Sequence, residues 1–348
     1  MLTKSAIATL FYNFSVRECK GSSELYEHLA LKVSEDETLL QLASYSKPGQ
    51  PVPNLLFGTV HYLLLKGHDH PLNRYYESVT ENAKKNMNDA FEHFKDFCEI
   101  HRSEIITMLQ TKLVQTNEVR RCAYLYPSFC YIYNKVKRPL ALIEIGTSAG
   151  LQLFWDEYHY SYGTEEMYGN KDGNVHLQSE VKGEEMPSLS QTSPPVIERI
   201  GLDLHVNDLR DEEDYFWLRS LIWPEHKERL QLFDRAAAHV KDKEFTLVEG
   251  DGVALLPEVA KHISKEAAIC IFHTHVANQI PEDIKQKLVE QVKALGAQRD
   301  VFHLYNNMWD RNLHLDSFID GKEYNETIAE TDGHARWFHW KVAGESFC

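Results

Sequence analysis

The spacing of apolar residues changes near residue 140. Before it, apolar positions recur every three to four residues, as at Phe57, Leu64 and Leu65, which predicts helices. After it, short apolar runs alternate with helical patterns, which predicts strands and helices in turn. We therefore expect an α/β protein with an N-terminal helical domain over residues 1–139 and a mostly parallel sheet in residues 140–348.

The stretch from Leu140 to Leu153 is central to this prediction. An apolar run from Leu140 to Ile145 indicates a strand buried on both faces. A turn of small residues follows, and after Gly150 the apolar spacing becomes helical. Glycines allow a sharp turn and close approach of a ligand, and unpaired N–H groups at a helix start can face that ligand. The sequence predicts a nucleotide-type cradle here.

Four more strands are expected after this turn. They cover residues 196–203, 245–251, 267–275 and 300–308, and the segments 318–324 and 336–340 indicate antiparallel strands at the end. Parallel strands with crossover helices bring their carboxyl ends to one edge, where ligands bind. The polar residues expected at that edge are Glu144, Asp203, Asp251, His273, His275, Asn306 and Asn307.

Charge and cysteine content narrow the function. The formal charge of −15 argues against general binding to nucleic acid or to an anionic membrane, which favours a small-molecule substrate and leaves a basic protein as the alternative. The first residues lack a long apolar segment with a cleavage site, and no apolar run approaches about 20 residues, so we expect a cytoplasmic protein. The six cysteines form no CxxC pair, which favours buried reduced thiols.

The glycine turn resembles that of class I methyltransferases dependent on S-adenosylmethionine. The pattern Glu144-x-Gly146-x-Ser148-x-Gly150 matches their motif, with Ser148 in place of the usual central glycine. By this resemblance, Asp203 is the acid that binds the ribose hydroxyls and Asp251 contacts the adenine amine. The resemblance implies a Rossmann-like methyltransferase-type sheet with an antiparallel C-terminal strand, and S-adenosylmethionine as cofactor.

A second resemblance covers almost the whole chain. The segments PNLLFGTVHYLLLKG, QTNEV, EIGTSAGLQL, DEYHYSYG, GLDLHVNDLRDEEDYFWLRSLIWPEHKERLQ and DGHARWFHW are similar to the bacterial family catalogued as domain of unknown function 2332. That resemblance implies a methyltransferase-like core with a helical N-terminal region, and it implies no activity.

The spacing departs from the methyltransferase pattern at one point. Asp203 lies 203 − 144 = 59 residues after Glu144, whereas a helix and a strand need about 20. Either residues 160–195 are an insertion, which would leave the edge of the sheet and can cover a pocket, or Asp203 is not the ribose-binding acid.

Two histidines at the end of the fourth strand leave alternatives open. His273 is the first candidate for a catalytic base and His275 the second. If both rings lie on one side of the strand, they can also bind a metal in a hydrolase. A third alternative is a non-catalytic ligand-binding protein of the same fold, and capping of the next helix is the simpler explanation for Asp203 and Asp251.

Overall fold

The computed structural model describes residues 2–84 and 86–342, and the chain forms two compact units. Unit 1 comprises residues 1–116 and 210–234, and unit 2 comprises residues 117–209 and 235–348. This division differs from the expected boundary after residue 139. Residues 117–139 belong with the sheet because their helix packs on it, and a segment after the second parallel strand belongs with the N-terminal helices.

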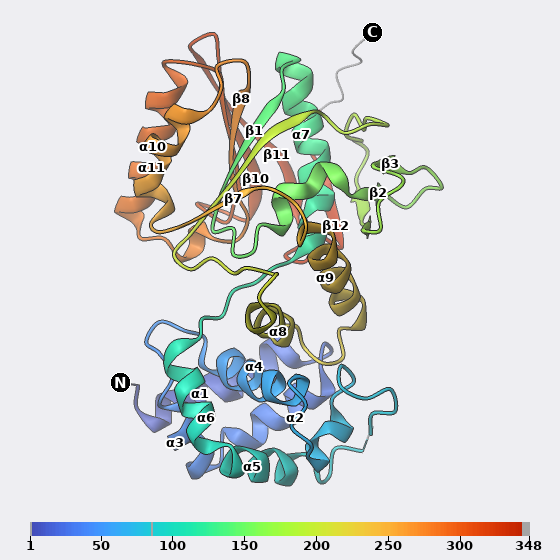
Figure 1. Cartoon of the computed structure of the whole chain (residues 1–348), viewed down its shortest axis with the longest axis vertical. Helices are drawn as coiled ribbons and strands as arrows, with labels where there is room; N and C mark the ends of the chain where they lie inside the picture. Colours follow the sequence, from blue (N-terminus) through green and yellow to red (C-terminus); the bar gives the residue numbers. More distant parts are fainter. Residues whose placement is uncertain (1, 85, 343–348) are drawn as a thin grey trace. The chain divides into compact units, whose positions relative to one another are not determined.

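Unit 1 is helical throughout its described part (Figure 1). Its elements are α1 (Lys4–Asn13), the π-helix η1 (Phe14–Cys19), α2 (Glu24–Val33), α3 (Glu37–Ala43), α4 (Val52–Leu65), the 3-10 helix η2 (Pro71–Tyr75), α5 (Ala90–Ile100), α6 (Arg102–Thr111) and α8 (Glu212–Ser220). A further helix, α9 (Lys227–Val240), begins in unit 1 and continues into unit 2.

Helix α4 forms the core of unit 1. Twelve of its fourteen residues are buried, so it is apolar on all sides, as expected of a central helix. Phe57 on α4 packs against the four rings of Phe11, Phe14, Tyr26 and Phe94, at centroid distances of 4.7 to 5.9 Å. Aromatic packing of this kind fixes α4 among its neighbours.

Unit 2 contains a nine-stranded mixed sheet. Its strand order is β5-β12-β11-β10-β9-β8-β1-β6-β7. The strands are β1 (Leu140–Ile145), β5 (Glu180–Lys182), β6 (Val196–Asp203), β7 (Thr246–Glu249), β8 (Ala268–His273), β9 (Val301–Asn306), β10 (Asn312–Ile319), β11 (Lys322–Thr331) and β12 (Trp337–Trp340). Strands β7, β6, β1, β8 and β9 are parallel, and β10 runs antiparallel beside β9.

Helices cover both faces of this sheet. On one face, α10 (Gly252–His262) and α11 (Glu282–Gly296) pack on the apolar core around Ile143, Ile269 and Ile271. On the other face lies α7 (Cys122–Val136), preceded by the 3-10 helix η3 (Val119–Arg121). The central strand β1 is buried at all six positions, which confirms the prediction of a strand covered on both faces.

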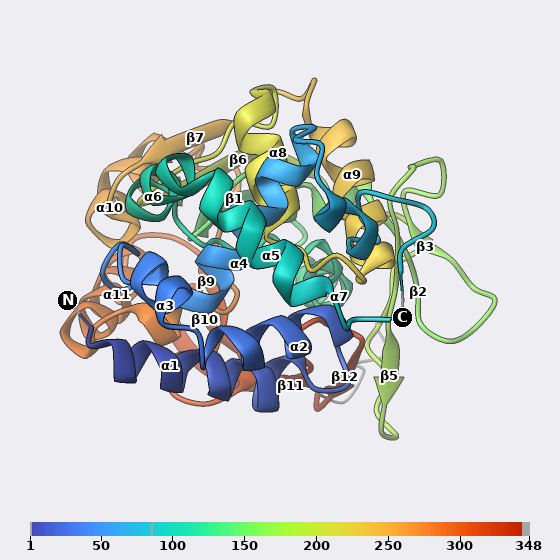
Figure 2. The ribbon, with the colours of Figure 1, turned by 90° about the horizontal axis from the view of Figure 1, so that it is seen from below.

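The expected insertion forms strands of its own. Three short strands, β2 (His159–Ser161), β3 (Tyr168–Gly169) and β4 (His176–Gln178), make a separate sheet in the order β3-β2-β4. Figure 2 shows β2 and β3 on the opposite side of unit 2 from α10 and α11. The insertion then returns to the main sheet, because β5 pairs in parallel with β12.

Two expectations about the whole chain also have an outcome here. Within the described ranges, no helix combines the length and apolar character that crossing a bilayer requires. Cys19, Cys98, Cys122, Cys130 and Cys270 are free and buried, as predicted. Cys348 lies outside the described residues.

Candidate functional site

The turn after β1 is held by hydrogen bonds within unit 2. Four of its N–H groups donate to protein acceptors: Gly146 and Thr147 to the Leu202 carbonyl at 2.7 and 3.3 Å, Ser148 to Asp203 Oδ2 at 2.7 Å, and Gly150 to the Thr147 carbonyl at 3.0 Å. The N–H groups of the turn itself are therefore used within unit 2, and the cradle predicted from N–H groups at the start of the next helix stays a prediction. The donors of the turn are occupied by the neighbouring strand β6 and by the turn itself.

The helix expected after Gly150 is also different. The segment is the seven-residue 3-10 helix η4 (Leu151–Glu157), and Phe154 inside it leaves helical dihedral angles at φ −104° and ψ 21°. Phe154 packs edge-on against Phe245 at 5.1 Å, and the Arg199 guanidinium lies 5.0 Å from its ring centre. Tertiary packing of this ring has overridden the local helical pattern, so the turn does not lead into an α-helix.

The glycines of this turn are required by their conformation and by neighbouring side chains. Gly146 has φ 76°, and a Cβ there would lie 2.3 Å from Cγ2 of Val276. Gly150 has φ 73°, and a Cβ there would lie 2.5 Å from the Phe245 ring. Both positions therefore need glycine for internal reasons, whether or not a ligand approaches.

Ser148 stands where the related motif has a glycine, and its backbone explains that preference. Its φ of 53° lies in the left-handed region, which residues other than glycine rarely adopt. Hydrogen bonds hold it there: Oγ accepts from Nδ2 of Asn117 at 2.7 Å and of Asn207 at 3.0 Å, and its carbonyl accepts from the Asn207 N–H at 2.9 Å. The sequence analysis missed Asn207, although it follows the second strand closely in the segment HVND.

Glu144 supports the same turn from the end of β1. Its side chain is buried, and Oε2 accepts a hydrogen bond from Thr147 Oγ1 at 2.6 Å. Burial, with a smaller contribution from the nearby carboxylate of Asp203, raises the pKa of this carboxyl to about 8. Glu144 therefore stabilises the conformation of the turn through its hydrogen bond with Thr147. The sequence analysis did not identify Thr147 as a candidate residue.

The two aspartates at neighbouring strand ends have different partners. The Asp203 carboxylate accepts from the N–H of Ser148 at 2.7 Å and of His205 at 3.1 Å, and burial raises its pKa. Asp251 is exposed, and its Oδ1 caps α10 by accepting from the N–H groups of the second and third residues after it, at 2.9 and 3.2 Å. The structure thus brings Asp203 to the glycine turn and gives Asp251 the capping role.

The sequence analysis considered His273 and His275 on one side of a strand. In the structure they do not share one side. Strand β8 ends at His273, and His275 has φ 58°, so the alternation of a strand does not continue to it. His273 is fully buried, and its Nε2 lies 3.2 Å from Nε2 of His303 on β9. Burial lowers the pKa of His273 to about 4 and of His275 to about 3, so both rings are neutral at pH 7.

The hydrogen bonds of His275 define its tautomer. Nδ2 of Asn307 lies 3.1 Å from Nδ1 of His275, and an amide nitrogen only donates, so Nδ1 is the acceptor. The proton of the neutral ring is then on Nε2, a buried atom with no hydrogen-bond partner among residues 2–84 and 86–342. In this tautomer His275 offers a donor rather than a base.

Strained residues mark the carboxyl ends of three neighbouring strands. Among the described residues, six non-glycine residues have positive φ, and Ser148, His275 and Asn307 are three of them. They follow β1, β8 and β9, which are adjacent in the sheet. Non-glycine residues in the left-handed region persist where their surroundings fix them, and such positions cluster at functional sites.

Further polar side chains surround the end of β8. Arg121 Nη1 donates to the carbonyl of Thr274 at 3.4 Å, and Thr274 Oγ1 donates to Gln152 Oε1 at 3.1 Å. Glu118 is buried and pairs with His334 Nδ1 at 2.9 Å. Arg121 also donates through Nε to the main chain of the loop between β11 and β12 at 3.2 Å. Charged and polar groups distant in sequence therefore meet at this edge of unit 2.

His61 in unit 1 is a buried structural histidine. It is fully buried, with Nδ1 2.8 Å from the Ser220 carbonyl and Nε2 2.6 Å from Ser78 Oγ. Burial lowers its pKa to about 3, so the ring is neutral, and both nitrogens are used within unit 1.

Comparisons with known proteins place the chain in one family. No curated protein matches the chain, and no solved structure matches it either. The model of one family, described as "Uncharacterized protein conserved in bacteria (DUF2332)", matches residues 8–340. Since the match covers nearly all of the sequence, the chain belongs to this family of uncharacterised bacterial proteins.

Proposed function

We propose that unit 2 binds S-adenosylmethionine at the turn after β1 and transfers its methyl group to a small-molecule acceptor. The strand order β7-β6-β1-β8-β9 supports this proposal. After β1 the chain adds β6 and β7 on one side of it and then β8 and β9 on the other, so the order of the strands reverses between β1 and β8. In open α/β sheets, ligands bind beyond the carboxyl ends of the strands at such a switch point. The antiparallel β10 beside β9 also suits a methyltransferase-type sheet.

The observation that carries the proposal is the use of the turn's N–H groups. Phosphate-binding turns present unpaired N–H groups to the ligand. Here the N–H groups of Gly146, Thr147 and Ser148 are already bonded to β6 residues. An adenosine compound without phosphates fits such a turn better than ATP or a dinucleotide does.

Asp203 is the residue that would bind the ribose. Its carboxylate lies at the end of β6, where it accepts the N–H groups of Ser148 and His205, and a carboxylate can accept further hydrogen bonds of the kind that ribose hydroxyls donate. Glu144, Ser148 and the two glycines would shape the turn, and Asp251 would contact the adenine amine through the oxygen that does not cap α10. S-adenosylmethionine supplies an electrophilic methyl group on a sulfonium when bound.

The residues at the ends of β8 and β9 would bind the acceptor. The Nε2–H of His275 is buried and has no partner among the described residues, so an acceptor oxygen that entered beside it would satisfy this donor and be oriented by it, and Asn307 holds the ring in that tautomer. His273, the other predicted base, is buried against His303. An acceptor that is nucleophilic without losing a proton, such as a carboxylate, suits this pair of neutral rings, and a general base is then not needed.

Turnover is tested with methyl-labelled S-adenosylmethionine and the small-molecule fraction of a bacterial extract. We expect labelled product and S-adenosylhomocysteine in equal amounts, and at least a tenfold lower rate in His275→Gln with unchanged affinity for S-adenosylhomocysteine. The matched control is His262→Gln, because His262 is an exposed histidine on α10, with 76% of its side chain accessible. Equal rates in both variants would overturn the assignment of His275.

A metal-dependent hydrolase built on His273 and His275 finds less support. In the described part of the chain, the two rings belong to no group of three His, Cys, Asp or Glu ligand atoms within 4.8 Å of one another. They also have different surroundings, since His273 faces β9 and His275 lies beside Asn307.

A further inference from the structure

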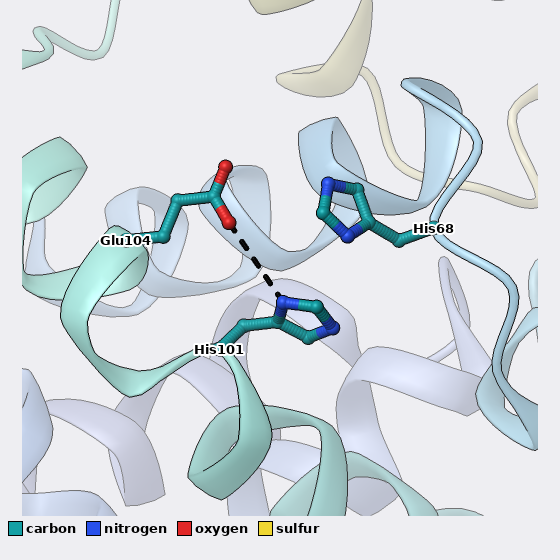
Figure 3. Close-up of side chains that lie close together, drawn as sticks. All are labelled: His68, His101 and Glu104. Carbon is teal, nitrogen blue, oxygen red and sulfur yellow. Dashed lines mark ion pairs between the residues drawn. The ribbon is translucent and has the colours of Figure 1, made fainter.

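Three side chains in unit 1 converge away from the sheet. His68 follows the end of α4, His101 lies between α5 and α6, and Glu104 is in the first turn of α6 (Figure 3). One nitrogen from each ring and one carboxylate oxygen all lie within 4.8 Å of one another. Residues three apart on a helix share a face, so the spacing of His101 and Glu104 places both beside the loop that carries His68.

The contacts among the three side chains are one histidine–carboxylate pair and one contact between rings. Nδ1 of His101 is 3.7 Å from Oε2 of Glu104, too long for a hydrogen bond, and Figure 3 marks this pair. The two rings meet edge to face at a centroid distance of 4.6 Å. The neighbouring His70, in contrast, already pairs with Asp96 at 3.0 Å.

An aromatic side chain restricts the movement of the two imidazoles. Phe97 on α5 lies against both rings, at 6.4 Å from His68 and 4.4 Å from His101.

We propose that His68, His101 and Glu104 bind a divalent transition-metal ion of the zinc class. Two imidazoles and one carboxylate are a ligand set of zinc sites that keep a fourth position open. Nitrogen ligands favour zinc over magnesium and calcium, which prefer oxygen alone. The carboxylate can close the site by rotating, because 48% of the Glu104 side chain is accessible and it moves more freely than the two rings.

This site is independent of the proposed cofactor site, because all three ligands belong to unit 1. A bound metal would join the loop after α4 to the junction of α5 and α6. It would stabilise the folded form by mass action, since the unfolded chain does not hold the three ligands together. We therefore expect an upward shift of roughly 5 °C in the melting temperature at saturating zinc.

The test is a calorimetric titration of chelator-treated, untagged full-length protein with zinc chloride, with magnesium and calcium chloride as controls. We expect one zinc per chain with a dissociation constant on the order of micromolar or tighter, and no binding of magnesium or calcium at the same concentrations. His101→Gln and His68→Gln should each weaken zinc binding at least tenfold. Glu104→Gln should also weaken zinc binding, but less than either histidine variant does.

One control variant and one spectroscopic measurement make the result specific. His275→Gln should bind zinc like the wild type, which separates this site from the histidines of unit 2. Cobalt should give the visible absorption of a tetrahedral site, and His101→Gln should lose it. Wild-type zinc affinity in both His68→Gln and His101→Gln, or no stoichiometric zinc in the folded wild type, would overturn the proposal. Binding of S-adenosylhomocysteine is measured separately, so failure of one proposal does not imply failure of the other.

Discussion

The ends of β1 and β7 look alike in the sequence and differ in the structure. Each strand leads through glycines and a small polar residue into a segment with helical spacing. After β7, Asp251 caps the α-helix that follows it in the chain. After β1, the turn is instead held by β6, because Asp203 accepts the Ser148 N–H from the neighbouring strand.

The difference shows how to separate a capping residue from a site residue. A cap satisfies N–H groups two or three residues away, so its role is complete within one turn. The link from Asp203 to Ser148 spans 55 residues and joins the ends of β6 and β1. A long-range bond of this kind fixes two strand ends relative to one another, whereas the local cap fixes only a helix start.

The largest expected effect is that of Gly146→Ala. The new Cβ would meet Val276, and the positive φ adds strain, so we expect a loss of about 3 kcal/mol in the free energy of unfolding. The matched control is Gly163→Ala, where φ is 80° and nothing lies within 4 Å of the new Cβ, and about 1 kcal/mol should be lost. Urea unfolding measures both, and equal losses would contradict the packing against Val276.

Removing the long-range carboxylate comes next. Asp203→Ala leaves the N–H groups of Ser148 and His205 without their acceptor, which should cost about 2 kcal/mol in urea unfolding. Affinity for S-adenosylhomocysteine should fall at least tenfold. Asp203→Asn keeps an acceptor oxygen and should recover part of the stability. Wild-type affinity in both variants would remove Asp203 from the cofactor site.

The buried carboxyl of Glu144 predicts a dependence on pH. Its pKa is about 8 in the folded chain against 4.5 ordinarily, so the folded state binds more protons between these values. The contribution of Glu144 to the free energy of unfolding is therefore fully present below pH 4.5 and is lost as the pH rises towards 8. As the pH rises from about 5 to about 8, the free energy of unfolding of Glu144→Gln should increase relative to that of the wild type by on the order of 2 kcal/mol, measured by urea unfolding. A difference that does not vary with pH would contradict the raised pKa.

Asp251 should give the smallest effect on stability. Asp251→Ala should cost about 1 kcal/mol by losing the cap of α10, whereas Asp251→Ser keeps a capping oxygen and should cost at most about 0.5 kcal/mol. If the second carboxylate oxygen contacts adenine, Asp251→Ser should also weaken S-adenosylhomocysteine binding about threefold. Unchanged binding, measured by calorimetry, would leave Asp251 with the cap alone.

The periodic features of the sequence predicted the sheet well. The expected strand over residues 196–203 is β6 with the same bounds, and the other four parallel strands lie within their expected ranges. Buried apolar runs at short spacing leave few alternatives to a strand. The exception was the segment after Gly150, where packing of Phe154 against Phe245 replaced an α-helix by a short 3-10 helix.

The site was harder to predict, because its contacts join distant segments. The link between Asn117, Asn207 and Ser148 depends on pairing of β1 with β6 and has no local sequence pattern. The alternation of strand side chains misplaced His275, because the strand ends two residues earlier, at His273, and His275 itself has a positive φ. Local patterns specify elements, whereas hydrogen bonds across strand ends emerge only from the folded sheet.

The central claim is that the turn after β1 binds an adenosine compound without phosphates. The most direct measurement is a calorimetric titration of the purified, ligand-free protein with S-adenosylmethionine and S-adenosylhomocysteine, with NAD and ATP as controls. We predict micromolar binding of the two sulfur compounds and at least a hundredfold weaker binding of NAD and ATP, because the N–H groups that would bind phosphate are already bonded to β6. No binding of either sulfur compound by folded protein, or equal binding of ATP, would contradict the account.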